Sequence, residues 1–260
     1  RVGGGCRLFG RGGGVGPRSG PAGRDAAAAA LGADLPLDPA ADVQGITREG
    51  DTVVVRFRDR DATREERFDW LLAATGRAPA LDGLNLAASG LTLDEHGAPT
   101  VDPLTMQSEG GHIFFAGDVA ARIPLLHEAA DDSRIAGDNA GRFPQVQTHR
   151  RRTPLGIVFT DPNIATVGAS FAELSEGLCD FAIGEVDFAD QGRARVLRQN
   201  RGLLRVYGER ATGRLLGAEM VTPRGEHLAP LLAWAVQAGM AVETALPMPF
   251  HPPGIERGPP

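Results

Sequence analysis

The chain has 260 residues, of which 42% are hydrophobic, and a formal charge of −6 at pH 7. This composition can build one large domain or two to three smaller ones, and the acidic balance argues against a dedicated nucleic-acid binder. No apolar stretch is long enough to span a bilayer, and the sequence from Arg1 lacks the regions of a secretory signal. We therefore expect a soluble protein with no membrane partner and a cytoplasmic location.

The amino-terminal part has the pattern of the back half of a nucleotide-binding unit. Residues 6–11 predict a short strand, and residues 25–31 predict a helix that ends before Gly32. Residues 52–57 and 66–74 lie on either side of a polar turn, which predicts a hairpin whose second strand returns buried. The glycines at 3–5 follow no strand and precede no helix, so we interpret them as the ragged start of a fragment.

Residues 113–119 contain an apolar run that is followed by Gly117 and Asp118, and a helical pattern follows from Leu125. A strand that ends in this way leaves one carboxylate at the carboxyl edge of a sheet, where open α/β folds bind their ligands. Such an acid can hold a ribose or ribityl hydroxyl. Turns of this composition also arise for conformational reasons alone, so the interpretation depends on the flanking segments 74–79 and 134–140.

The carboxyl-terminal part predicts a separate α+β unit. Residues 145–152 form a polar connection, and we interpret the arginines at 150–152 as a solvated hinge rather than a binding site. The later segments read as strands of an antiparallel sheet and one helix, at residues 153–162, 202–207, 214–221 and 228–239.

His251 and Glu256 lie five positions apart on a proline-rich turn near the end of the sequence. A histidine that acts as an acid or base needs a partner that fixes its tautomer, and a carboxylate can do this where the chain turns back. The alternative is an exposed loop histidine. Cys6 and Cys179 have no activating neighbour, so we interpret Cys6 as a small buried hydrophobe and neither cysteine as a nucleophile.

Taken together, the segments around Gly76, Asp118 and His251 resemble the flavin-dependent pyridine nucleotide-disulfide oxidoreductases, most of all the dihydrolipoamide dehydrogenases. The resemblance implies an α/β fold: partial nucleotide-binding α/β domains followed by an α+β dimerisation domain. Residues 1–78 would belong to the nicotinamide nucleotide domain, residues 79–148 to the carboxyl-terminal part of the FAD domain, and residues 149–260 to the interface domain.

The resemblance also implies roles for particular residues. FAD and NAD or NADP would be the cofactors, and an arginine at position 11 in place of an acid would favour NADPH, unless Arg11 is only a solvated turn residue. His127 would face the flavin or merely pack. The residues expected to bind the cofactors are Asp118, Gly117, Pro124, Leu125, Leu126, His127, Gly76, Arg11 and Val43.

At the carboxyl end, the resemblance makes His251 the base that deprotonates a substrate dithiol and Glu256 its orienting acid, both acting across a homodimer. The substrate would be a small dithiol or disulfide, or a lipoyl domain. The sequence departs from the family in lacking its redox disulfide and first nucleotide-binding fold, and residues 257–260 cannot form the helix that follows there. We therefore expect an amino-terminally truncated chain. Alternatives are a mercuric or glutathione reductase-like enzyme and a non-catalytic dimerisation fragment.

Overall fold

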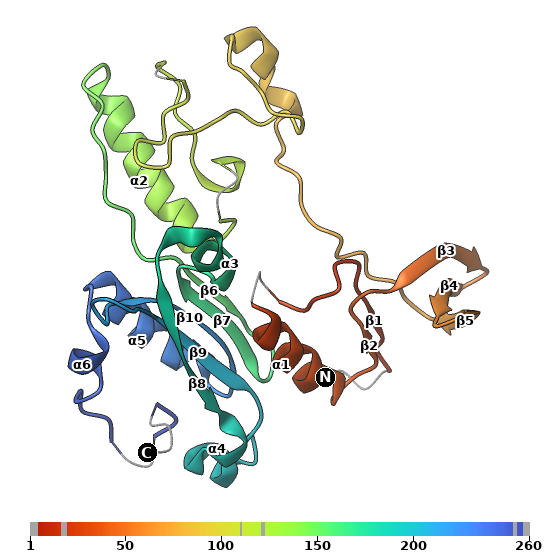
Figure 1. Ribbon diagram of the computed structural model, residues 1–260. Coiled ribbons are helices and arrows are strands. Elements are labelled where there is room, and N and C mark those ends of the chain that lie inside the picture. The colour runs from red at the N-terminus through yellow and green to blue at the C-terminus, as the bar shows by residue number, and fades with distance from the viewer. Residues whose placement is uncertain (1–4, 17–19, 110, 121–122, 252–253, 257–260) are drawn as a thin grey trace. The chain divides into compact units, whose positions relative to one another are not determined.

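Figure 1 shows the computed structural model, which describes residues 5–16, 20–109, 111–120, 123–251 and 254–256. The chain divides into two compact units, one made of Arg1–Leu72 with Thr153–Pro260 and the other of Ala73–Arg152. The segment 257–260, expected not to be helical, lies outside the described residues. No helix in the described part of the chain is long and apolar enough to cross a membrane.

The amino-terminal segment of the first unit forms the predicted strand-and-helix step. β1 (Leu8–Phe9) pairs in parallel with β2 (Leu37–Asp38), and α1 (Pro21–Gly32) connects them. The alanine run of α1 has the highest helix propensity, and the proline stands at the first position, where its missing N–H is not needed. The predicted helix is confirmed. Cys6 is exposed rather than buried, because the strand begins only at Leu8.

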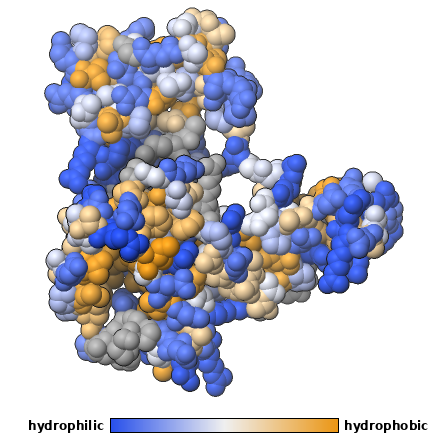
Figure 2. Space-filling model, viewed as in Figure 1, coloured by the Kyte–Doolittle hydropathy of each residue, from blue (hydrophilic) through white to orange (hydrophobic). Residues whose placement is uncertain are grey.

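Three antiparallel strands follow, namely β3 (Asp42–Glu49), β4 (Thr52–Asp59) and β5 (Ala62–Phe68). The predicted hairpin is confirmed, but its second strand ends at Phe68 and is not continued to residue 74. Trp70 and Leu72 are 89% and 88% exposed. A buried strand needs a neighbour to accept its backbone hydrogen bonds, and no described strand pairs with residues 69–81. The side of the small sheet that Figure 2 shows is mostly hydrophilic, and exposed cross-strand pairs such as Arg56–Glu65 lie on the sheet.

A five-stranded antiparallel sheet forms the centre of the first unit, in the order β6-β7-β10-β9-β8. Its strands are β6 (Leu155–Val158), β7 (Asn163–Gly168), β8 (Phe181–Asp187), β9 (Leu203–Glu209) and β10 (Leu215–Thr222). Short helices lie between and after them: α3 (Phe171–Glu173), η4 (Leu174–Leu178), η5 (Phe188–Asp190), α4 (Gly192–Leu197) and α6 (Val242–Ala245). The predicted α+β organisation of this region is confirmed.

The two faces of this sheet carry different helices (Figure 1). Ala165 and Met220 share a core with α5 (Gly225–Gln237), whereas the adjacent Ile164 and Val221 share a core with α1. Successive strand residues point to opposite faces, so α5 covers one face and α1 the other.

A buried glutamate joins α1 to this sheet. Glu219 of β10 is 2% exposed, and its carboxylate accepts the N–H of Gly20 at 2.7 Å and that of Phe171 at 3.2 Å. Gly20 directly precedes α1, and Phe171 is the first residue of α3. The negative charge of Glu219 therefore lies at two helix amino termini, where the helix dipoles favour it. The start of α1 is thereby tied to the carboxyl-terminal sheet.

The second unit has little regular structure besides α2 (Leu126–Arg142), with 3₁₀ turns η1 (Asp82–Leu84), η2 (Leu86–Ser89) and η3 (Gly117–Ala120). Its core consists of Met106, Ile135 and Ala136. The predicted strand over residues 113–119 is wrong: only a single bridge joins Gln107 to Phe114, and the chain then turns into η3. One bridge with no continuing partner cannot sustain a strand.

Candidate active site

Asp118, the expected hydroxyl-binding acid, lies in η3, and its side chain is half exposed. Arg77 contacts it, with Nη1 at 3.4 Å from Oδ2, and also donates from Nη2 to the carbonyl of Pro124 at 3.2 Å. One guanidinium thus joins three segments that the sequence analysis selected separately, around Gly76, Asp118 and Pro124. The role of Arg77 was missed, because its only sequence signal is its position after a glycine.

Gly117 and Gly76 both have backbone conformations that favour glycine, with φ of +79° and +121°. A Cβ at Gly76 would meet no atom within 4 Å, so the surroundings leave open space beside that backbone. The N–H of Gly117 faces a carboxylate oxygen of Asp132 at 3.3 Å. This bond attaches the turn that carries Asp118 to the first half of α2.

α2 begins directly after the segment from Pro124 to Leu125, and among the described residues no side chain caps its amino terminus at Leu125. Leu126 is 88% exposed and the His127 side chain is half exposed, so both face solvent in this unit. An uncapped helix start presents backbone N–H groups and the positive end of the helix dipole. This end of α2 can therefore stabilise negative charge on a ligand.

A buried ion cluster holds the same helix in place. Arg151 contacts Glu128 at 2.9 Å and Asp132 at 2.6 Å, and the three side chains are 10%, 5% and 7% exposed. Burial alone would lower the pKa of Arg151, but the two carboxylates outweigh it and raise the pKa above its ordinary value. The interpretation of residues 150–152 as a solvated hinge is therefore wrong for Arg151. The arginine run alone does not show that two acids on α2 face it.

Two of the expected cofactor residues lie in the other unit. Arg11 is exposed in a bend after β1, and no ion pair of its side chain occurs within the described ranges. Val43 is half buried in β3, opposite Phe57 of β4 and beside a register shift before Gly45. Their geometry is that of a turn residue and a sheet residue, and their expected roles stay predictions.

The carboxyl-terminal turn is anchored at Ile255, which is 7% exposed and belongs to the core between the five-stranded sheet and α5. His251 is exposed and Glu256 is half buried on either side of it. A Cβ at Gly254 would overlap a carboxylate oxygen of Glu256 and lie 3.0 Å from the carbonyl oxygen of His251. The carbonyl oxygen of His251 and the carboxylate of Glu256 therefore both lie close to Gly254, and the pairing of the His251 imidazole with Glu256 stays a prediction.

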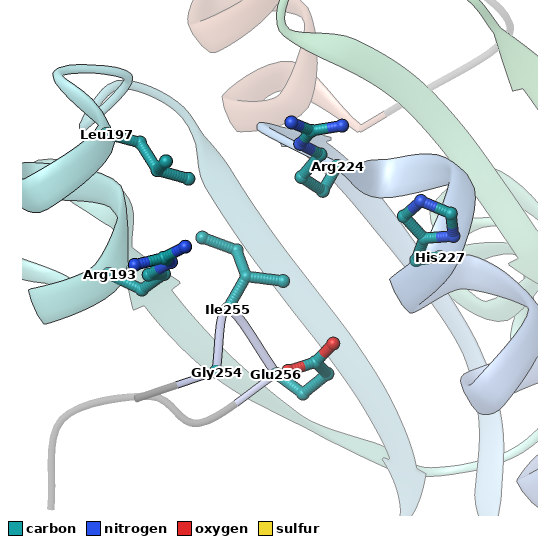
Figure 3. A pocket seen from close by; sticks show the side chains of 7 residues that line it. All are labelled: Arg193, Leu197, Arg224, His227, Gly254, Ile255 and Glu256. Carbon is teal, nitrogen blue, oxygen red and sulfur yellow. The ribbon is translucent and has the colours of Figure 1, made fainter. Parts of the chain in front are cut away.

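The turn borders a hollow of about 320 Å³ (Figure 3). Ile255 lies between Arg193 and Leu197 of α4 on one side and His227 of α5 on the other. Arg224 completes the lining at the start of α5. The hollow is thus lined by two arginines, one histidine and a single carboxylate, that of Glu256. This hollow was not predicted, because its cationic residues come from segments far apart in sequence.

Two models of one protein family match the chain. "Pyridine nucleotide-disulphide oxidoreductase" matches residues 19–133, and "Pyridine nucleotide-disulphide oxidoreductase, dimerisation domain" matches residues 155–257. Together with the fold, these matches define an α/β part of this family followed by its dimerisation domain. The chain belongs to the pyridine nucleotide-disulfide oxidoreductase family, which depends in general on FAD and NAD(P), and the predicted fold class is confirmed.

Known relatives agree with this assignment. The chain is 32% identical over 215 residues to a dihydrolipoyl dehydrogenase of Haloferax volcanii, which covers 82% of the chain and 44% of the relative. It is 29% identical over 210 residues to a mercuric reductase of Streptomyces lividans, covering 81% and 44%. The Cu(II) complex of the HOCl-induced flavoprotein disulfide reductase RclA from Escherichia coli superimposes with a TM-score of 0.76 at 25% identity, covering 92% and 54%. The chain spans about 44% of the length of these curated relatives.

Proposed function

We propose that the protein transfers electrons between a nicotinamide nucleotide, FAD and a dithiol or disulfide substrate, most specifically as a dihydrolipoyl dehydrogenase. The observation that carries this proposal is the 32% identity to the Haloferax volcanii dihydrolipoyl dehydrogenase over 82% of the chain. The mercuric reductase, at 29%, supports the shared flavin chemistry but leaves the substrate open between them. Whether the nucleotide is NAD or NADP rests on Arg11, whose exposure suits either role.

The second unit has the features that the flavin end of FAD needs. Asp118 offers an exposed carboxylate to a ribityl hydroxyl, Arg77 holds that carboxylate beside Pro124, and α2 presents an uncapped amino terminus. When bound, the flavin carries the redox step between hydride and thiol chemistry. Around it the chain orients the ring through Pro124 to His127 and leaves open space at Gly76 for a nucleotide.

The carboxyl-terminal turn supplies proton handling. His251 would remove a proton from the substrate dithiol, because the thiolate is the reactive form, and Glu256 would stabilise the resulting imidazolium. The packing of Ile255 in the core holds this turn against the sheet. Exposure of His251 suits a residue that acts on a group outside its own domain.

We further propose that the protein is a homodimer. Residues 155–257 match a dimerisation domain, and this region carries large exposed apolar side chains. Trp234 and Leu231 lie one turn apart on the outer side of α5 and are 71% and 38% exposed, and Phe159 is 78% exposed. Apolar surface of this kind is typical of protein interfaces. The pair of one subunit would then serve the flavin of the other.

The experiment is to replace His251 by Gln in the complete FAD-loaded dimer. Loss of a positioned base should slow dithiol oxidation by roughly two or more orders of magnitude, while flavin reduction by NAD(P)H stays unchanged. His96→Gln is the matched control, because His96 is an exposed histidine on a turn of the second unit, remote from Asp118 in sequence. Unchanged dithiol turnover in the His251 variant would contradict the assignment.

A second candidate is a non-catalytic dimerisation role, favoured by the placement of the two cysteines. Cys6 and Cys179 are both free, and they lie far apart in sequence. The 260-residue chain purified alone should then show little lipoamide-linked turnover. A yellow preparation with stoichiometric flavin and full activity would exclude this second candidate.

A further inference from the structure

Gln191 is a buried polar side chain beside the carboxyl-terminal turn. It is 2% exposed and stands at the N-cap of α4, where its Oε1 accepts the N–H of Ala194 at 2.7 Å. A glutamine is not among the preferred N-cap residues, which are Ser, Thr, Asp and Asn. Capping alone does not explain why this longer side chain is buried here.

The other end of the carboxamide reaches the tail. Its Nε2 donates to the carbonyl of Gly254 at 3.0 Å and to that of Ile255 at 3.4 Å. These bonds join residues 63 and 64 positions apart in the chain. Because Gly254 and Ile255 directly precede Glu256, the carboxamide holds the backbone next to that acid.

Little else in the described structure fixes this turn. Ile255 gives it one apolar anchor in the core, and the close approach of Gly254 to the His251 carbonyl oxygen leaves room for only a hydrogen at that position. An apolar anchor sets depth but not direction, because hydrophobic contacts are not directional. Hydrogen bonds to two successive carbonyls set the orientation of the peptide planes.

We propose that Gln191 is a positioning residue, which orients the His251–Glu256 pair by holding the carbonyls of Gly254 and Ile255 while it caps α4. This inference rests on the proposed function, in which that pair handles the substrate proton. Gln191 itself touches neither substrate nor flavin. Its contribution is that the imidazole is held in a productive position before the substrate arrives.

Gln191→Asn separates the two roles of the side chain. Asn is a favoured N-cap residue, so it keeps the cap of α4, but it is one methylene too short to reach the tail carbonyls. Gln191→Leu removes both roles at similar volume. Asn200→Leu is the matched control, because the Asn200 amide donates to the Ala189 carbonyl at 2.9 Å, on the same loop but away from the tail.

The first readout is the backbone order parameter of Ile255 and Glu256 from nuclear magnetic resonance relaxation in the 260-residue chain, which needs no flavin. We expect both Gln191 variants to lower these order parameters from about 0.85, typical of rigid backbone, toward about 0.6, and Asn200→Leu to match wild type. Wild-type order parameters in Gln191→Asn would overturn the proposal, even if Gln191→Leu fails to fold.

The second readout is flavin reduction in the complete FAD-loaded dimer. Reduction by dithiol should slow about tenfold or more in Gln191→Asn, whereas reduction by NAD(P)H should not change. Lower order parameters in the tail with normal dithiol reduction would overturn the positioning role. A wild-type dimer that no dithiol reduces would overturn the proposed function and the positioning role together. The order parameters of the Gln191 variants would then still show whether the carboxamide anchors the tail.

Discussion

Replacing Arg151 by Met should strongly destabilise the second unit. Its side chain is 10% exposed and contacts Glu128 and Asp132, which are 5% and 7% exposed. Removal of the guanidinium leaves two carboxylates buried without their cation, and breaking a buried pair in this way costs roughly 3–5 kcal/mol. Because Asp132 also accepts the N–H of Gly117, the turn that carries Asp118 should loosen as well.

An arginine of α2 itself provides the control. Arg142 contacts Asp138 on the same helix at 2.9 Å, but the two side chains are 52% and 33% exposed, and exposed pairs contribute only about 0–1 kcal/mol. Arg142→Met should therefore change stability little. Amide hydrogen exchange along α2 measures the local unfolding free energy of each variant without requiring the whole chain to unfold in one step.

Equal losses in the two variants would refute the reasoning, since they would mean that burial does not decide the strength of these pairs. A triple variant gives a further check. Adding Glu128→Gln and Asp132→Asn to Arg151→Met removes the stranded charges, so part of the lost stability should return. A triple variant less stable than Arg151→Met would point to packing of the arginine stem as the main contribution.

Two further predictions concern the five-stranded sheet. Burial first, and then the negative charge of Glu219, raise the pKa of Tyr207 above its ordinary value of 10.0. Above pH 10 the unfolded chain therefore loses this proton first, so the free energy of unfolding should fall as pH rises. Tyr207→Phe should remove that decline in urea titrations at pH 9 to 11. An unchanged decline in this variant would contradict the prediction. Glu219→Gln should weaken the docking of α1 by roughly 1.5–3 kcal/mol, seen as faster exchange of the α1 amides, because one carboxylate oxygen becomes a donor facing an N–H. Glu185→Gln, at a half-exposed site paired with Arg205, should leave those amides unchanged, and an equal effect of both would argue against a specific role for Glu219.

Local signals predicted the elements that depend on local physics. The alanine run between a proline and a glycine gave α1, and the polar turn between Val-rich segments gave the β4–β5 hairpin. The pairing of His251 with Glu256, which also rests on local spacing, stays a prediction. For the helix and the hairpin, neighbouring residues in the sequence supply the determining interactions.

Elements that depend on distant partners were not predictable in the same way. Residues 113–116 are apolar enough for a strand, but a strand needs a paired neighbour, and Phe114 finds only a single bridge to Gln107. The burial of Arg151 depends on two acids that face it from α2, more than fifteen positions earlier in the chain. Likewise, nothing near Gln191 in the sequence indicates that its partners are Gly254 and Ile255.

The bond between the Gly20 N–H and Glu219 spans 199 positions of the chain, and it has a consequence for biosynthesis. At a translation rate of about 5–20 residues per second, β10 emerges roughly 10–40 seconds after α1. During that interval the alanine-rich helix has no sheet to cover its apolar side. A nascent chain stalled before β10 should therefore leave this segment open to proteases, and release of the finished polypeptide should protect it.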